Sequence, residues 1–96
     1  MIKLITWEMD RSHAPADPAE RLKLTMAHCE MVKKDIDSGQ MKMWGINPGC
    51  NHGFAVTDGD EKDICAMVVR FIPHVTFRVE SMLSIDEVIG ILKTMK

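Results

Sequence analysis

Two tryptophans and an arginine are the residues of this chain best suited by type and position to line a ligand site. Trp7 ends the first expected strand, Trp44 ends the second, and Arg78 lies in the last. Indole rings form apolar pocket walls, and a guanidinium binds carboxylate or phosphate groups through paired hydrogen bonds. Together with His13, in the loop after the first strand, they predict a cleft for a small ligand in which Arg78 would hold an anionic group. The alternative is that Arg78 pairs with Glu80, two residues along the same strand face.

Cys50 and His52 place two metal-binding side chains in the glycine-rich loop 47–53. A zinc site needs three or four converging ligands, usually as closely spaced Cys or His pairs. No such pair accompanies them, so we expect ordinary loop residues and no metal site. His28 and Asp35, seven residues apart on a helix, are separated by about 10 Å along its axis, too far for a hydrogen bond. The sequence has no phosphate-binding loop or nucleophile elbow, and we expect no cofactor.

The composition argues against several classes of protein. The 96 residues include 12 Lys and Arg against 14 Asp and Glu, which is not the basic excess of a nucleic-acid-binding protein. Two Trp, three Phe and no Tyr make a base-stacking surface improbable. Three cysteines without a C-x-x-C pair indicate a reducing compartment. Because no apolar run resembles a signal peptide or reaches the roughly 20 residues of a membrane span, we expect a cytoplasmic protein without nucleic-acid or membrane partners.

Apolar periodicity predicts a single domain over residues 1–96 in which strands and helices alternate. Strands are expected at 2–9, 40–46, 54–57 and 75–82. Asp17 and Ser84 are typical helix N-caps and predict helices over 18–38 and from 85 onward. The acidic stretch 58–63 favours a further helix over a rival strand at 64–72. The order β-α-β-β-α-β-α predicts an α+β, ferredoxin-like βαββαβ fold with an extra C-terminal helix.

The helix over 18–38 carries two apolar stripes. The stronger stripe has spacings of four, three, three and four, which predicts the buried face. It consists of Leu22, Met26, Cys29, Val32 and Ile36. The weaker stripe, Leu24 and Met31, lies on nearly the opposite side, beside His28 and Asp35. We expect this second stripe to face solvent or a partner chain.

Both faces of the expected sheet carry apolar residues. In the first strand, Ile2 and Leu4 alternate with Ile5 and Trp7. If the two long helices cover one face, the other is a partly apolar surface of several hundred Å2, which monomers seldom expose. A chain of this length also buries only a limited share of its surface by itself. We therefore predict a homodimer through the open sheet face, whose paired sheets approximate a barrel.

Five different short motifs lie within or next to the expected strands. They are Thr6-Trp7, Trp44-Gly45, Gly53-Phe54-Ala55-Val56, Arg70-Phe71 and Val75-Thr76-Phe77-Arg78-Val79. Over residues 1–90 this layout resembles a small prokaryotic family of unknown function in the dimeric α/β-barrel group, which also contains muconolactone isomerases and small cofactor-independent monooxygenases. The resemblance implies a homodimeric α/β barrel with a small-molecule cleft in each subunit and no defined catalytic residue.

Two functions remain open at the level of sequence. The first is a non-catalytic homodimeric module that binds a small organic ligand without a cofactor. The alternative, implied by the resemblance, is a small cofactor-independent enzyme of isomerase or monooxygenase type. An enzyme of this kind needs an ionisable group on the cleft wall with a partner in reach. The candidates are His13, His28, His52 and His74.

Overall fold

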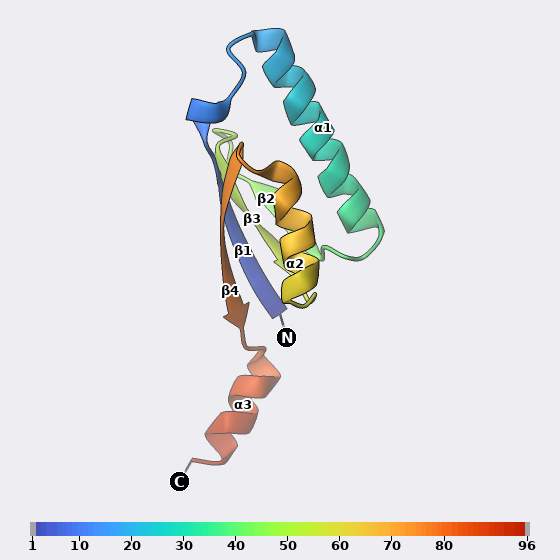
Figure 1. Ribbon diagram of the computed structural model, residues 1–96. Helices are drawn as coiled ribbons and strands as arrows, with labels where there is room; N and C mark the ends of the chain where they lie inside the picture. The colour runs from blue at the N-terminus through green and yellow to red at the C-terminus, as the bar shows by residue number, and fades with distance from the viewer. Residues whose placement is uncertain (1, 96) are drawn as a thin grey trace.

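A four-stranded antiparallel sheet forms the centre of the molecule (Figure 1). The computed structural model describes residues 2–95. The strands lie in the order β2-β3-β1-β4, so that β1 pairs with β3 on one side and with β4 on the other. Their bounds are β1 (Ile2–Met9), β2 (Met43–Ile46), β3 (His52–Thr57) and β4 (Val75–Met82).

The β2–β3 hairpin is present, but its strand ends differ from those expected. β2 begins at Met43 rather than at residue 40, and β3 begins two residues early at His52. The chain before β2 is held irregularly, because the Thr57 hydroxyl donates to the Gln40 carbonyl oxygen at 2.7 Å. A side-chain bond of this kind takes the place of a ladder bond at residue 40, and backbone pairing with β3 resumes where the Lys42 amide donates to the Val56 carbonyl oxygen at 2.7 Å.

Three helices alternate with the strands, and each begins after a side chain that caps its free amides. Asp17 precedes α1 (Pro18–Asp37), Asp60 precedes α2 (Glu61–Val68), and Ser84 precedes α3 (Ile85–Lys93). In α2 and α3 a carboxylate in the first turn bonds back to the cap residue, which completes a capping box. Short 3-10 turns follow β1 and α2, namely η1 (Arg11–His13) and η2 (Val69–Phe71). The helix expected after the acidic stretch is thus confirmed, and the rival strand is wrong.

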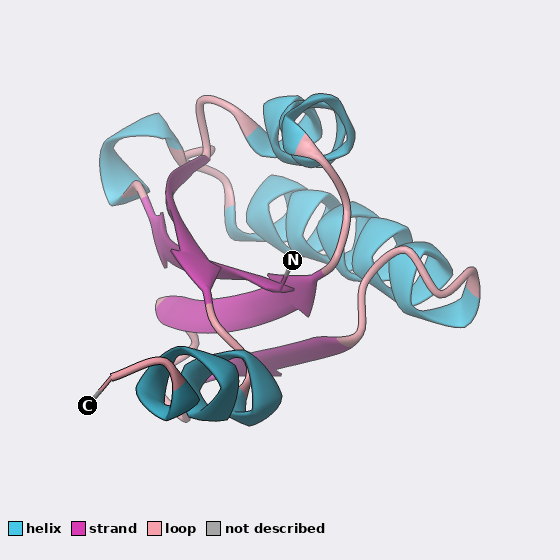
Figure 2. Cartoon of the chain, turned by 90° about the horizontal axis from the view of Figure 1, so that it is seen from below, coloured by secondary structure: helices cyan, strands magenta, loops and turns pink. Residues whose placement is uncertain are grey.

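α1 and α2 lie on one side of the sheet, whereas α3 lies on the other side and beyond its end (Figure 2). The face of the sheet turned away from α1 and α2 is called the open face below. These elements confirm an α+β fold with a four-stranded antiparallel sheet and three helices. Their arrangement is consistent with the expected ferredoxin-like fold.

The buried core joins the sheet mainly to α2 and η2. Its buried members form two clusters, Ile5, Met41, Ala55, Ile64 and Met67 in one and Trp7, Phe71 and Val75 in the other. α1 adds partly buried side chains to these clusters, but its one buried residue is Asp35. The long helix is therefore held over the sheet by fewer apolar contacts than its length would allow.

The predicted buried stripe of α1 is wrong except at Val32, which is partly buried and packs against the core. Leu22, Met26 and Ile36 are 67%, 57% and 42% exposed, and Cys29 is exposed as well. The partly or fully buried side is instead the one that carries the weaker stripe, with Leu24, His28, Met31, Val32 and Asp35.

Two polar side chains account for this rotation of α1. Asp35 forms an ion pair with Arg70, and the His28 ring packs edge-on against Phe71. A buried carboxylate without a cation is strongly destabilising. The Asp35–Arg70 ion pair therefore determines the orientation of α1 more strongly than the difference in burial between the two apolar stripes does.

Candidate functional site

An apolar cavity, which we call the inner chamber, lies between α1 and the sheet. The volume open to the centre of a water-sized sphere is about 90 Å3, several times the roughly 10–15 Å3 that one water molecule needs. Aromatic side chains dominate its lining, which includes Trp7, Trp44, Phe71 and Phe77. The polar side chains among its lining residues are Thr25, His28 and Cys29. Such walls favour a small organic molecule over ordered water.

Two indole rings form one wall of the inner chamber. Trp7 of β1 and Trp44 of β2 stack with their ring centroids 5.6 Å apart and their planes 15° apart. β3 lies between these strands, and the residues opposite the two indoles are Gly53 and Ala55, whose small size leaves the rings room to meet. A Cβ on Gly53 would lie 2.6 Å from Trp7 Cζ2 and 2.0 Å from the Gly45 carbonyl oxygen, so this position requires glycine. The structure thus brings together the two tryptophans that the sequence pointed to.

The indole nitrogen of Trp7 is a buried donor without an acceptor. Trp7 is only 8% exposed, yet no hydrogen-bond partner for its Nε1 lies within residues 2–95. Buried donors of this kind are rare in native structures, and each one calls for an explanation such as a missing water, ion or ligand. Trp7 therefore leaves one buried donor unsatisfied beside an otherwise apolar chamber.

A wider and more polar space, the outer chamber, adjoins the inner one. Its volume on the same measure is about 410 Å3, and it shares Met9, Thr25, His28 and Val75 with the inner chamber. Its other polar lining residues come from the turn after β1, the first turns of α1 and the loop before β4, and include Asp10, Arg11, Arg21 and His74. Together the two chambers form one cleft, apolar at its inner end and charged at its outer end.

His28 and His74 lie where the two chambers meet. Their ring centroids are 5.9 Å apart, and the His28 ring also packs edge-on against Phe71 at 5.0 Å. Burial lowers the pKa of His28, and the neighbouring charge of His74 lowers it further. His28 is therefore a neutral imidazole at neutral pH, and one of its ring nitrogens can accept a proton or a hydrogen bond.

The orientation of His74 is set by the turn after β1. Its Nδ1 lies 3.1 Å from the carbonyl oxygen of His13, and because a carbonyl only accepts, Nδ1 carries the proton. When the ring is neutral, Nε2 is then left as an acceptor. His13 itself is exposed, and its Nδ1 lies 2.8 Å from the Asp10 carboxylate. The Ser12 hydroxyl and His13 lower the pKa of Asp10, which keeps this carboxylate charged beside the outer chamber. His13 thus supports His74 through its backbone rather than lining either chamber.

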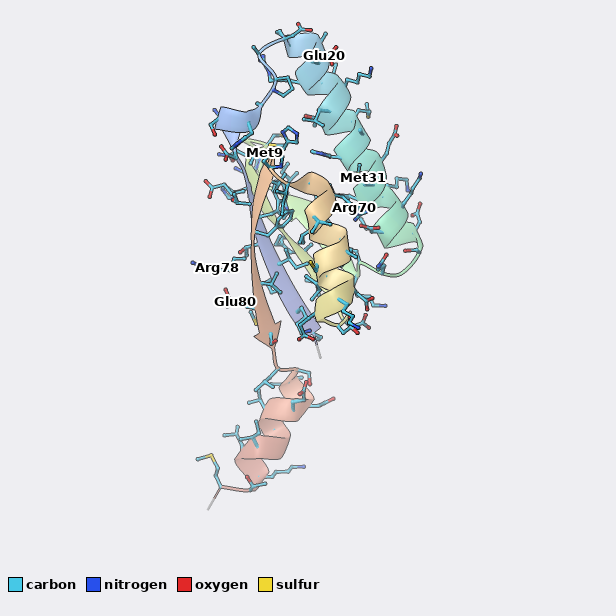
Figure 3. All side chains as sticks on the ribbon, viewed as in Figure 1. Met9, Glu20, Met31, Arg70, Arg78 and Glu80 are labelled. Carbon is cyan, nitrogen blue, oxygen red and sulfur yellow. The ribbon has the colours of Figure 1, made fainter. Side chains whose placement is uncertain are left out.

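Arg78 does not lie in the cleft. It is exposed on the open face of β4, directly opposite Thr6 of β1 (Figure 3). The reason is the two-residue alternation of a strand, because Phe77 lines the inner chamber and its neighbour must point to the other face. The cations of the cleft are instead Arg11 and Arg21, and Arg21 also donates hydrogen bonds to the backbone of the preceding loop.

An ion pair between Asp35 and Arg70 joins the C-terminal half of α1 to η2. Arg70 Nη2 lies 2.5 Å from Asp35 Oδ2, and Arg70 Nε donates to the Met67 carbonyl oxygen at 3.0 Å. Figure 3 shows Arg70 between α1 and α2. The side chain of Asp35 is 8% exposed and that of Arg70 is 33% exposed. This pair therefore helps to set the distance between α1 and the floor of the cleft.

The remaining sequence candidates lie away from the cleft. Cys50 and His52 are exposed at the β2–β3 turn, and within residues 2–95 no three His, Cys, Asp or Glu side chains are grouped to hold a metal ion. Of the four histidines that the sequence offered as candidates for the cleft wall, His28 and His74 line the cleft, whereas His13 and His52 do not. The signal that could have placed His28 is its position on the same helix face as Leu24, Met31 and Asp35.

Comparison with known proteins gives no independent indication of function. No known family model matches the chain, and no curated protein matches it. Among residues 2–95, no helix combines the length and the apolar character that crossing a membrane requires. A function must therefore be argued from the cleft itself.

Proposed function

We propose that the protein is a homodimeric binding module that takes a small organic ligand into the cleft between α1 and the sheet. The observation that carries this proposal is an apolar chamber in whose wall lies a buried indole N–H without an acceptor. A matching ligand has a flat apolar body that lies against the two indoles. Its polar end lies in the outer chamber near His28 and His74, where Arg11 favours an anionic group.

The chain supplies its own optical reporter for this binding. Trp7 and Trp44 are its two tryptophans, and both line the inner chamber. We choose 1-anilinonaphthalene-8-sulfonate (ANS) as the probe, because it joins a flat aromatic body to an anionic group. Excitation of the tryptophans should produce ANS emission by energy transfer, with a saturable dependence on ANS concentration.

A matched pair of variants separates the cleft from other apolar surfaces. Ala55→Leu fills the inner chamber from the sheet, whereas Ala27→Leu adds the same side chain to the exposed side of α1. We expect Ala55→Leu to weaken ANS binding at least about tenfold, equivalent to about 1.4 kcal/mol, and Ala27→Leu to leave it unchanged. Equal binding by the wild type and Ala55→Leu would refute a ligand site in the inner chamber.

The homodimer is proposed from the open face. Arg78 and Glu80 both project from this face of β4, and neither forms an ion pair with any residue from 2 to 95 (Figure 3). A two-fold axis near them would place Arg78 of each copy beside Glu80 of the other, because such an interface is self-complementary. Paired in this way, the two sheets would form a dimeric α/β barrel.

Charge reversal tests this interface without touching the core. Arg78→Glu alone creates like charges across the axis, and we expect it to raise the dimer dissociation constant by about tenfold or more in sedimentation equilibrium. The double variant Arg78→Glu, Glu80→Arg should restore the wild-type constant. A monomeric wild type, or a double variant as weak as the single one, would refute this interface.

A second candidate function, a small cofactor-independent enzyme of isomerase type, is favoured by the two histidines at the junction of the chambers. A neutral His28 can take a proton from an acidic carbon of a bound ketone, which leaves an enolate and an imidazolium, and then return it. With 2-tetralone in D2O, exchange at the acidic carbon followed by NMR should be faster with the wild type than with buffer. His28→Asn should abolish the acceleration, and His52→Asn, altered at an exposed site, should not. Absence of acceleration would leave the binding function as the better account.

A further inference from the structure

The C-terminal helix α3 has no packing partner within the described chain. None of its residues is buried, and it extends from the end of β4 away from the sheet (Figure 1). The molecule is consequently 61 Å long and only 25 and 23 Å across. Its radius of gyration is 16.2 Å, whereas a compact chain of this length has about 12.5 Å.

α3 nevertheless has the pattern of a helix that packs. Ile85, Ile89 and Leu92 are 71%, 42% and 58% exposed and fall on one side of the helix, with the partly buried Val88 between them. The opposite side carries Asp86, Glu87, Gly90 and Thr94, together with the exposed Ile91. A nine-residue helix is marginal in water by itself, so its stability depends on covering this apolar stripe.

The apolar stripe of α3 lies next to the apolar end of the open face. α3 is on the same side of the sheet as that face (Figure 2). The half of the open face nearest to α3 carries Ile2, Leu4, Met43, Val56 and Met82 with one charged residue, Glu80, whereas the far half carries Glu8, His52 and Thr76. Apolar surface is thus concentrated at one end of the sheet and continues toward the helix.

The area of the open face alone is small for a stable dimer. Four strands spaced about 4.8 Å apart, the longest of 8 residues at about 3.3 Å each, give at most about 500 Å2 in projection. A standard interface covers about 800 Å2 of accessible surface on each partner, a measure that runs larger than projected area. The exposed side of α3 is the nearest apolar surface that would extend the interface.

We infer that α3 belongs to the dimer interface, where its stripe of Ile85, Ile89 and Leu92 packs against the second copy beyond the end of its own sheet. This inference depends on the homodimer proposed above and adds a specific segment to it. A membrane surface is the less favoured occupant, because α3 begins with two acidic residues and has Lys93 as its one basic residue, too few to attract anionic lipids.

Two adjacent residues of α3 provide a matched test in the full-length chain. Ile89→Glu places a charge within the stripe, whereas Gly90→Glu places the same charge on the opposite side, where a Cβ meets nothing within 4 Å. We expect Ile89→Glu to raise the dimer dissociation constant by about tenfold or more, and Gly90→Glu to change it less than about threefold. Leu92→Glu should repeat the effect of Ile89→Glu, and circular dichroism checks that the sheet remains folded.

The possible outcomes distinguish this inference from the homodimer itself. A wild-type dimer that Ile89→Glu and Gly90→Glu weaken equally, or not at all, would overturn the role of α3 and leave the open-face dimer in place. A wild type that is monomeric at every concentration would overturn both. Binding of the wild type to phosphatidylserine vesicles, lost in Ile89→Glu, would assign α3 to a membrane surface instead.

Discussion

Removing the charge of Asp35 should destabilise the protein far more than the same change at a nearby surface position. Asp35→Asn preserves the shape of the side chain but leaves the Arg70 guanidinium without its counter-charge. Removing one partner of a fully buried pair costs about 3–5 kcal/mol, and losing a hydrogen bond to a charged group costs about 1.5–3 kcal/mol. Because the Arg70 side chain is 33% exposed and keeps its bond to the Met67 carbonyl, we expect a loss of about 2 kcal/mol.

A loss of this size is readily measured. For a domain of this length it corresponds to a decrease in Tm of about 8–16 °C. Urea denaturation, followed by tryptophan emission and by circular dichroism, should give the same free-energy difference from both signals if unfolding is two-state. All variants must be compared at one protein concentration, because dimerisation would make the apparent stability depend on concentration.

Asp37→Asn is the control for Asp35→Asn. It removes the same charge two residues further along α1, where Asp37 forms an exposed pair with Lys33 at 3.4 Å. Such pairs contribute about 0.3–0.5 kcal/mol. If Asp35→Asn and Asp37→Asn differ by less than about 0.5 kcal/mol, the Asp35–Arg70 pair does not hold α1 in place, and the account of its rotation is wrong.

Two further predictions concern the cleft. Because burial lowers the pKa of His28, the unfolded chain binds the proton first, so this group reduces stability as the pH falls from about 7 through about 6.5. Urea midpoints at about pH 7 and 5.5 should therefore differ less in His28→Asn than in the wild type or His52→Asn. If the midpoints of His28→Asn differ as much as those of the wild type, His28 does not cause this pH dependence. Gly53→Ala should cost about 1–3 kcal/mol and alter the near-ultraviolet dichroism of Trp7, because its Cβ would overlap that indole and a backbone oxygen. Gly45→Ala, which meets only a side chain, should cost less in the same denaturation experiment, and equal losses would count against the close packing at Gly53.

Most of the elements could be predicted because their signals are local. The caps at Asp17 and Ser84 mark where helices begin, and the alternation through residues 75–82 marks a strand. In β1 the same alternation puts Ile5 and Trp7 together on the face that lines the inner chamber. It should also have excluded Arg78 from that face, since Arg78 follows Phe77 directly. Chemical type alone grouped Arg78 with the tryptophans, although the two-residue period of the strand separates their faces.

The sequence by itself determined the α+β class, the order of strands and helices and the charge balance, because capping, alternation and composition act over a few residues. Which side of α1 faces the sheet was decided only by the tertiary structure. The apolar pattern alone favours the stronger stripe, and the observed choice depends on Arg70, 35 residues along the chain from Asp35. The pairing of His28 with His74 and the missing acceptor of Trp7 Nε1 follow from that choice. Such features arise where distant segments meet, so no local pattern encodes them.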